Sequence, residues 1–373
     1  MTAATRLALI AMISALAIAA GSRVASAYPQ FQPGRDPTCT GCHISPAGGG
    51  LLNENGLATA AQDSQFGGPP EAAHGALAGW SWLTLGGDLR FAAGAVEDHG
   101  LGPQAFPMQL EFAASAKIAA GFSANATIGA TRGNNTVSSF ILSREHYVMW
   151  QADPDAPTGL FVRVGRFMPV YGLRLVDHTA LTERYGQTPL YGETYGAAIE
   201  YLADKYEVHA TGFVHDPIQE SQEHGNGGAL YAELHPGKFA IAAQARYANG
   251  PDDVRTAGGG TGKYDISDDL VLQAEASVIH QRFTAGGPAR NQLVSELVAS
   301  WFPADAWQLD VGVGQFDEDL HVPKVDREAF DVDLSYYLNA HWNFMLLNRV
   351  QTIDFGRGGR SSGWCLLQLH YRL

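Results

Sequence analysis

Residues 82–93 read WLTLGGDLRFAA, a stretch in which apolar and polar side chains alternate. One parity carries Leu83, Leu85, Leu89, Phe91 and Ala93, and the other carries Thr84, Asp88 and Arg90. Successive side chains of a β-strand point to opposite faces, so this stretch predicts a strand with one apolar face and one polar face.

The same alternation recurs as far as the last residue. The apolar sets are Phe106, Met108, Leu110, Phe112 and Ile118, then Leu270, Leu272, Ala274, Ala276 and Val278, then Phe330, Val332, Leu334, Tyr336 and Leu338. Charged residues make up only 17% of the chain although 46% of it is hydrophobic, and 43 of its 373 residues are glycine. Apolar residues spread by alternation, with almost no helical pattern, predict an all-β transmembrane barrel with a lipid-facing and a water-facing side.

The spacing of turn residues predicts the number of strands. Short turns are expected near residues 121, 155, 204, 236, 268, 304 and 340, and longer loops at 96–103, 133–137, 168–192, 216–226, 249–258, 284–290, 318–327 and 355–362. Seven turns and eight loops join sixteen antiparallel strands, with both ends of the barrel on the periplasmic side. The weakest strand is expected at 259–267, and its loss with a neighbour would leave fourteen.

The end of the chain carries a second barrel signal. Alternate positions there hold Cys365, Leu367, Leu369, Tyr371 and Leu373, and the chain stops at that point. This pattern resembles the carboxyl-terminal assembly signal of outer-membrane barrels, although Leu373 stands where Phe or Trp is usual. We expect Cys365 to act only as a small apolar residue on the last strand.

The first residues predict export. Arg6 precedes an apolar run from Leu7 to Ala20, and residues 25–27 read Ala-Ser-Ala, the small residues that precede a cleavage site. The chain is therefore divided into a signal peptide at 1–27, an irregular segment at 28–80 that is rich in Gly and Pro, and a barrel at 81–373.

The irregular segment contains the pentapeptide Cys39-Thr40-Gly41-Cys42-His43. C-x-x-C-H is the attachment pattern of a c-type haem: the two thiols add to the vinyl groups and the adjacent imidazole binds the iron. A disulfide or a zinc site is the alternative for the two cysteines, but zinc requires two further ligands and no second Cys/His cluster is present. We therefore expect one covalent haem c, held by Cys39, Cys42 and His43.

The second axial ligand stays open at this stage. The segment has no methionine, and His74 is its only histidine besides His43. His74 is the nearest candidate, although a solvated loop histidine is the other interpretation. Met108 or Met168 from the barrel, a ligand from another chain, or no sixth ligand are the remaining alternatives.

Residues 164–174, VGRFMPVYGLR, form a second motif. They resemble the strand-to-loop segment of the phosphate-selective porins, which form sixteen-stranded outer-membrane channels. Val170 replaces a second proline, and the lysine ladder of that family is absent, so phosphate selectivity is not implied. The loop at 168–192 is the longest, and we expect it to constrict the lumen or face the haem, a solvated outer loop being the alternative. Its charged and aromatic residues include Arg174, Asp177, His178, Glu183, Arg184, Tyr185 and Tyr191.

Together the two parts resemble the porin-cytochrome proteins, in which an outer-membrane barrel shields haem that carries electrons across the membrane. The resemblance implies electron transfer with periplasmic or outer-membrane multihaem cytochromes, with the haem segment on the periplasmic side or within the lumen. The alternative function is a diffusion porin whose haem segment is a plug, anchor or redox sensor. We expect no enzymatic activity, since no catalytic set of residues is apparent, and the net charge of −14 argues against a nucleic-acid partner.

Overall fold

The computed structural model describes residues 38–53, 55–56, 80–97, 102–130, 141–175, 177–219, 221–323, 326–339, 341–353 and 359–373. The signal peptide and residues 57–79, among them His74, lie outside these ranges. The strands are β1 (Leu83–Glu97), β2 (Pro103–Ala119), β3 (Phe122–Ala130), β4 (Ile141–Leu142), β5 (His146–Gln151), β6 (Gly159–Phe167), β7 (Thr194–Ala203), β8 (Tyr206–Val214), β9 (Asn226–Leu234), β10 (Phe239–Asn249), β11 (Asp253–Ser267), β12 (Leu270–Phe283), β13 (Arg290–Ala304), β14 (Trp307–Asp317), β15 (Asp326–Tyr337), β16 (Trp342–Ile353) and β17 (Arg360–Arg372).

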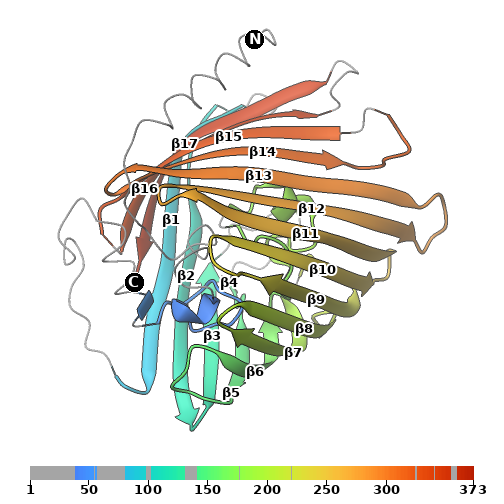
Figure 1. Ribbon diagram of the computed structural model, residues 1–373. Helices are drawn as coiled ribbons and strands as arrows, with labels where there is room; N and C mark the ends of the chain where they lie inside the picture. Colours follow the sequence, from blue (N-terminus) through green and yellow to red (C-terminus); the bar gives the residue numbers. More distant parts are fainter. Residues whose placement is uncertain are drawn as a thin grey trace.

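All the strands belong to one antiparallel sheet that closes on itself (Figure 1). Each strand pairs with its neighbour in sequence, and β1 pairs with β17 from Asp88↔Arg372 to Glu97↔Gly363. The short strands β4 and β5 both pair with β3, one after the other, so they are two halves of a single wall strand. The described residues therefore form a closed barrel with sixteen wall positions, as the turn spacing predicted.

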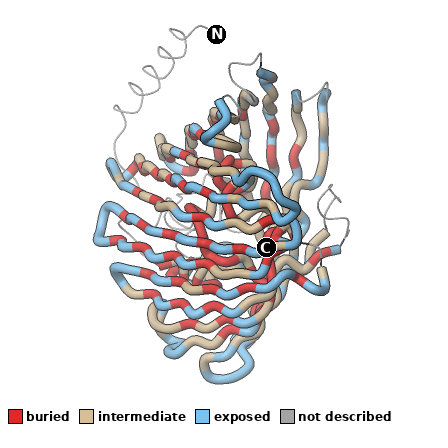
Figure 2. Tube along the Cα trace, turned by 90° about the vertical axis from the view of Figure 1, so that its right-hand side faces the viewer, coloured by how far each residue is buried: buried red, intermediate tan, exposed pale blue. Residues whose placement is uncertain are grey.

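The barrel is apolar outside and polar inside. Buried and exposed residues alternate along the strands in Figure 2. On β6, Val164 is 56% exposed, whereas its neighbour Arg163 is fully buried. On β7, Ile199 is 60% exposed, and Glu200 is fully buried. Polar side chains packed inside a shell of outward-facing apolar ones are the arrangement of a barrel with lipid around it, and the reverse of that of a soluble protein.

The short turns lie at the expected positions, but one loop prediction was wrong. The loop expected at 249–258 is only the three residues between β10 and β11, and β11 starts at Asp253 rather than near residue 259. The expected loop ended at Gly258, yet the whole run Gly258-Gly259-Gly260 lies within the strand. At Gly259 a Cβ would collide with the carbonyl oxygen of Ala276 on β12, so the close approach of the two strands requires glycine.

A second correction concerns Met108, which was placed on the lipid face of its strand. The pairing of β1 with β2 shifts register between Arg90 and Phe91, whose partners are Gln109 and Pro107, so Met108 is an extra residue in β2. Such a bulge offsets the alternation of the residues before it from that of the residues after it. Leu110 and Phe112 remain on the outer surface, while Met108 lines a cavity inside the barrel.

Two short helical segments are not part of the barrel wall: the 3₁₀-helix η2 (Cys39–Gly41) and the helix α3 (Leu181–Tyr185). No helix in the described ranges is long and apolar enough to cross a membrane. The helix α3 contacts the wall residues Glu296 and Phe316, and η2 contacts the turn at Pro157 and Arg174 of the loop after β6.

Candidate functional site: the Cys-x-x-Cys-His segment in the lumen

The pentapeptide has a compact local conformation. Residues 39–41 form η2, and the backbone N–H groups of Cys42 and His43 both donate to the carbonyl oxygen of Cys39, at 3.2 and 2.8 Å. The chain then returns on itself, because Ile44 N donates to Leu51 O at 3.0 Å and His43 forms a β-bridge with Leu52. The two cysteines and the histidine are therefore held by backbone hydrogen bonds within one tight unit.

The return of the chain depends on Gly48, Gly49 and Gly50, which all have positive φ, at 75, 71 and 59°. A Cβ on Gly48 would lie 3.3 Å from the Cys39 sulfur, whereas a Cβ on Gly49 or Gly50 would meet no atom within 4 Å. The glycines thus form a turn beside the cysteines that leaves one side of the segment open.

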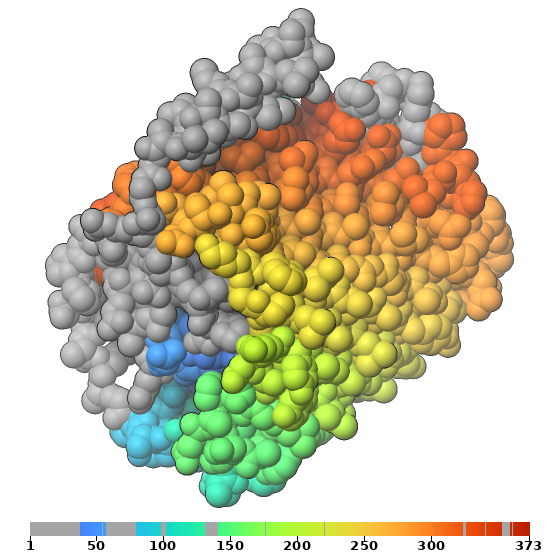
Figure 3. Space-filling view, in the orientation of Figure 1, coloured from blue at the N-terminus to red at the C-terminus, as the bar shows by residue number. Residues whose placement is uncertain are grey.

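This segment lies at the end of the lumen where the strands are joined by short turns. Thr40 Oγ1 donates to the carbonyl oxygen of Pro157, in the turn between β5 and β6. The side chain of Leu51 lies over Gly86, at the start of β1, where any Cβ would collide with it. Part of the segment, in blue, is visible in Figure 3 beside the cyan and green atoms of the first strands.

Polar and apolar contacts join the segment to the wall. Arg163 Nη1 on β6 donates to Ser45 Oγ at 3.4 Å. Ile44 packs against the buried cluster that contains Phe167, and Ala47 packs against the cluster that contains Val170. Residues 44–47, directly after the pentapeptide, are therefore folded into the lumen and contact β6 and the start of the loop that follows it.

A cavity of about 460 Å³ adjoins the motif. Its size is within the range of ordinary cofactor pockets. Cys39, Cys42 and His43 all line it, together with the three glycines and residues of β1, β2 and the loop after β6. Lining residues with groups that can bind iron or a carboxylate are Arg90, Met108, Arg144, Met168, Arg174, His178, His341 and Arg372.

The chemistry of these residues fits a covalent haem. Both thiols and the imidazole of one C-x-x-C-H motif share a single cavity, and the open glycine turn leaves space beside the sulfur of Cys39. Burial raises the pKa of the Cys39 thiol to about 11, so this cysteine is a neutral thiol at pH 7. Arg174 Nη1 lies 3.5 Å from its sulfur.

The loop between β6 and β7 crosses the lumen. Its residues 171–173 bind to wall strands that lie far along the barrel: Tyr171 donates to Ser277 Oγ at 3.1 Å, Gly172 N to Gln244 Oε1 at 2.7 Å and Leu173 N to Glu275 Oε2 at 2.9 Å. Further on, Leu181 N donates to Glu296 Oε2 at 3.0 Å. These contacts place the loop inside the lumen rather than in outer solvent, and Arg174 of the same loop contacts Cys39 and Ala47.

Arg174 joins this loop, the motif and the wall. Its guanidinium donates to Ala47 O at 3.1 Å and pairs with Glu207 Oε1 on β8 at 2.9 Å. The guanidinium also lies 5.1 Å from the ring centroid of Tyr231 on β9, within the range of a cation–π contact. The backbone of Arg174 has φ of 60°, a left-handed conformation that is costly for a residue with a side chain.

Charged side chains on the inner face of the wall lie next to the motif. Arg163 forms two hydrogen bonds with Glu200, at 2.8 and 2.7 Å, and His209 Nδ1 lies 3.0 Å from the same carboxylate. His209 Nε2 is 3.4 Å from Glu207, which in turn binds Arg174. These groups form one continuous network of ion pairs from β6 to the crossing loop.

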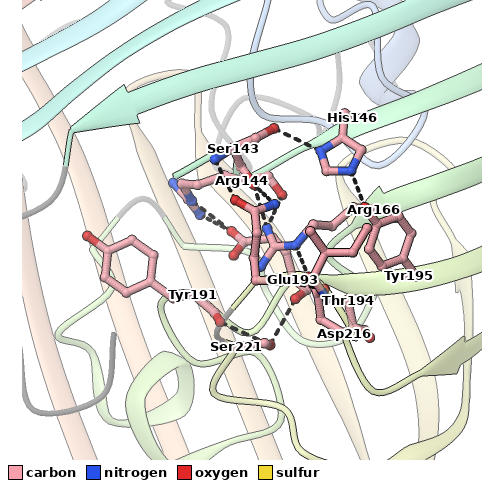
Figure 4. A network of polar contacts seen from close by, with 12 residues as sticks. Ser143, Arg144, His146, Arg166, Tyr191, Glu193, Thr194, Tyr195, Asp216 and Ser221 are labelled. Atoms are coloured by element: carbon pink, nitrogen blue, oxygen red, sulfur yellow. Dashed lines mark hydrogen bonds and ion pairs between the residues drawn. The ribbon is translucent and has the colours of Figure 1, made fainter. Parts of the chain in front are cut away.

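A second network fixes the outer end of the crossing loop (Figure 4). Arg166 pairs with Asp216 at 2.5 Å, and it also donates to the carbonyl oxygens of Ser143 and Arg144, at 2.8 and 2.6 Å. These two carbonyls lie at the break between β4 and β5. Arg144 then pairs with Glu193 at 2.5 Å, at the point where the loop enters β7. Arg166 thus satisfies backbone groups that the interrupted strand leaves unpaired in the ladder.

The structure brings together three of the four predicted site residues, Cys39, Cys42 and His43, whereas His74 lies outside the described residues. Sequence reasoning did not single out Arg163, Glu200 or His209, which support the motif from the wall. The signal that could have found them is parity, because each is a charged or titratable residue on the inward face of a strand whose other face is apolar.

No family model matches the sequence, and a search among curated proteins also found no match. Solved structures with the same fold do exist. OmpT of Vibrio cholerae has a TM-score of 0.62 at 12% identity, over 80% of this chain and 99% of that one. An anion-selective porin from Comamonas acidovorans has 0.60 at 12%, over 78% and 99%. The outer-membrane channel DcaP of Acinetobacter baumannii has 0.58 at 10%, over 80% and 100%.

These similarities define the class of fold: the chain is a porin-like β-barrel, and the barrel prediction is confirmed. At such low identity they carry no information on what passes through it. The C-x-x-C-H segment, packed inside the barrel, is the feature of this chain from which a function can be argued.

Proposed function

We propose that the protein is an outer-membrane, porin-like barrel that carries one covalent c-type haem and takes part in electron transfer together with other cytochromes. The observation that supports this proposal best is that Cys39, Cys42 and His43 line one cavity within the lumen. A motif exposed on a mobile tail would not need the wall contacts made by Thr40 and Ser45.

In this proposal Cys39 and Cys42 hold the porphyrin through thioether bonds, and His43 binds the iron from one face. A haem bound there supplies a one-electron redox centre. The wall would keep bulk water from one side of this centre, while the arginines that line the cavity would offset the negative charge of the propionates. We propose no catalytic role, because electron transfer requires only that the centre be held and insulated.

The location follows from the barrel. Its outward-facing apolar residues require a lipid environment, and in bacterial barrels the short turns lie on the periplasmic side. The motif, which contacts the short turn at Pro157, would then lie at the periplasmic mouth. Donors that reach it there would be periplasmic or outer-membrane cytochromes, including multihaem ones, and nucleic acid plays no part.

A partner is obligatory for transfer across the whole membrane. The hydrocarbon core is about 30 Å thick, and one haem at one mouth cannot bridge that distance, because tunnelling falls off exponentially. The second candidate function follows from the contacts of the segment with Pro157, Arg163 and Arg174: held in this way, the segment serves as a plug, anchor or redox sensor of a diffusion porin.

The decisive experiment uses the full protein in liposomes that enclose a redox dye, with and without a periplasmic cytochrome as donor. Wild-type protein should stain for haem on denaturing gels, and it should reduce the dye only when the donor is present. The C39S/C42S variant should lose both signals while solute passage stays within about twofold. Haem staining that survives in this variant would overturn the attachment site, whereas absent dye reduction with altered leakage would select the plug.

A further inference from the structure

We propose that Met168, the first residue of the loop that crosses the lumen, is the second axial ligand of the haem iron. This inference rests on the proposed function, because it assumes that a haem is attached at Cys39 and Cys42. It assigns to a barrel residue a role that the segment 38–53 cannot fill, since that stretch holds no methionine and no histidine other than His43.

Met168 directly follows β6 and lines the cavity that also contains Cys39, Cys42 and His43. Phe167, directly before it, and Val170, two positions after it, belong to clusters that contact the segment following the motif. Phe167 belongs to the buried cluster on which Ile44 packs, and Val170 belongs to the cluster on which Ala47 packs. Met168 is thus bracketed by the two contacts that hold residues 44–47, directly after His43.

The loop is also tied to the motif beyond Met168. Arg174 donates to Ala47 O at 3.1 Å, and its guanidinium reaches the sulfur of Cys39 at 3.5 Å. Residues 167–174 therefore contact residues 39–47 at both of their ends, through Phe167 and through Arg174. A ligand placed between them is held in position by packing, which keeps the cost of ordering it low.

The other cavity-lining candidates are held elsewhere. His178 is flanked by Asp177 and Thr179, and both bind Arg349 on β16, so that this part of the loop is attached to a different side of the barrel. The Nδ1 atom of His341 lies 2.8 Å from the carbonyl oxygen of Arg372. Met108 lies on β2, and its strand has no contact with the motif comparable to those of Phe167 and Val170 in the described residues.

The chemistry of methionine suits this role. A thioether is a soft, neutral ligand on an unbranched and flexible side chain, so it can adjust to the iron without burying a further charge. Histidine–methionine ligation also raises the reduction potential of a haem.

The test uses the purified, haem-loaded protein in detergent. The ferric wild-type protein should be low-spin and show the weak sulfur-to-iron charge-transfer band of methionine ligation. M168L keeps the volume of the side chain, so it should lose this band, become high-spin, bind cyanide faster by tenfold or more and have a lower reduction potential. M168H should restore the low-spin state without the band. M108L is the matched control, a methionine in the same cavity, and should behave as wild type.

Several outcomes would overturn the assignment. One is the absence of the charge-transfer band in wild-type protein, a result that does not depend on any variant folding. Others are an unchanged spectrum in M168L, or loss of the low-spin state in M108L, H178Q or H74A instead. Failure of the proposed function is distinguishable, because wild-type protein would then carry no covalent haem on a denaturing gel.

Discussion

Arg163 is a fully buried arginine on a strand that faces lipid on its other side. Its guanidinium lies 4.3 Å from the ring centroid of Phe167 and forms two hydrogen bonds with Glu200. A buried charge is tolerated only when it is paired and hydrogen-bonded, and each partner here would be costly alone. At the scale of single residues, a charged side chain of the lumen is therefore tolerated when it is paired, and it would destabilise the barrel without its partner.

Replacing Arg163 by Met should destabilise the barrel by about 3 kcal/mol, because Glu200 then remains buried without its main partner. The double variant R163M/E200M should recover most of the loss, since no charge is left unpaired. Urea-induced unfolding in detergent, followed by tryptophan fluorescence, measures both. An R163M variant that is no less stable than the double variant would show that the lumen solvates Glu200 well.

At the scale of elements, much of the wall could be predicted. Alternation predicted which faces of β12 and β15 point outward, since Gln273 and Glu275 are buried while Val278 is exposed. This prediction failed where the alternation of inward and outward side chains is interrupted. At Met108 a bulge adds one residue, and at 258–260 three glycines have no side chains to show the alternation. Neither a bulge nor a tight strand contact has a local signature.

The crossing loop contains the buried acid Glu183, at α3. It accepts a hydrogen bond from Leu175 N at 2.8 Å, and Thr188 Oγ1 lies 3.3 Å from its other oxygen. Burial first, and then the nearby charge of Glu275, raise the pKa of Glu183 to about 8. The folded loop thus keeps a proton that the unfolded chain releases near pH 4.5.

The sign of the pH dependence follows. Between about pH 4.5 and 8 the folded state binds more protons at Glu183 than the unfolded state, so this group makes stability fall as pH rises, by at most about 1.4 kcal/mol per pH unit. E183Q mimics the protonated form and should flatten this dependence. Unfolding midpoints in urea at pH 5, 6.5 and 8 measure it; equal slopes in E183Q and wild type would contradict the assignment.

The site was less predictable than the wall. The C-x-x-C-H spacing singled out Cys39, Cys42 and His43, and the structure places all three at one cavity. The position of the motif inside the barrel depends on contacts such as Thr40 with Pro157 and Arg174 with Ala47, which join residues more than a hundred positions apart. Such contacts leave no mark on the local pattern, so the sequence allowed the lumen and the periplasmic side as equal alternatives.

At the scale of the whole molecule, closure of the barrel wall does not depend on the segment that lies inside it. The pairing of β1 with β17 closes the barrel without any residue of the motif segment. Deleting residues 28–79 should therefore leave a heat-modifiable barrel, and its conductance in planar bilayers should rise severalfold as the lumen is cleared. The C39S/C42S variant is the control that keeps the chain in place. A deletion variant with unchanged conductance would show that the crossing loop alone sets the passage.

The closed ladder between β1 and β17 has a further consequence for biogenesis. The motif lies inside the ring but precedes the first strand, so its contacts with the wall can form only once the two terminal strands have met. Under the proposed function, a porphyrin would be joined to Cys39 and Cys42 most readily before that stage, while the wall does not yet enclose the two thiols. Cytochrome assembly first and membrane insertion second is then the expected order of maturation, and a cell deprived of haem should accumulate barrels without the group.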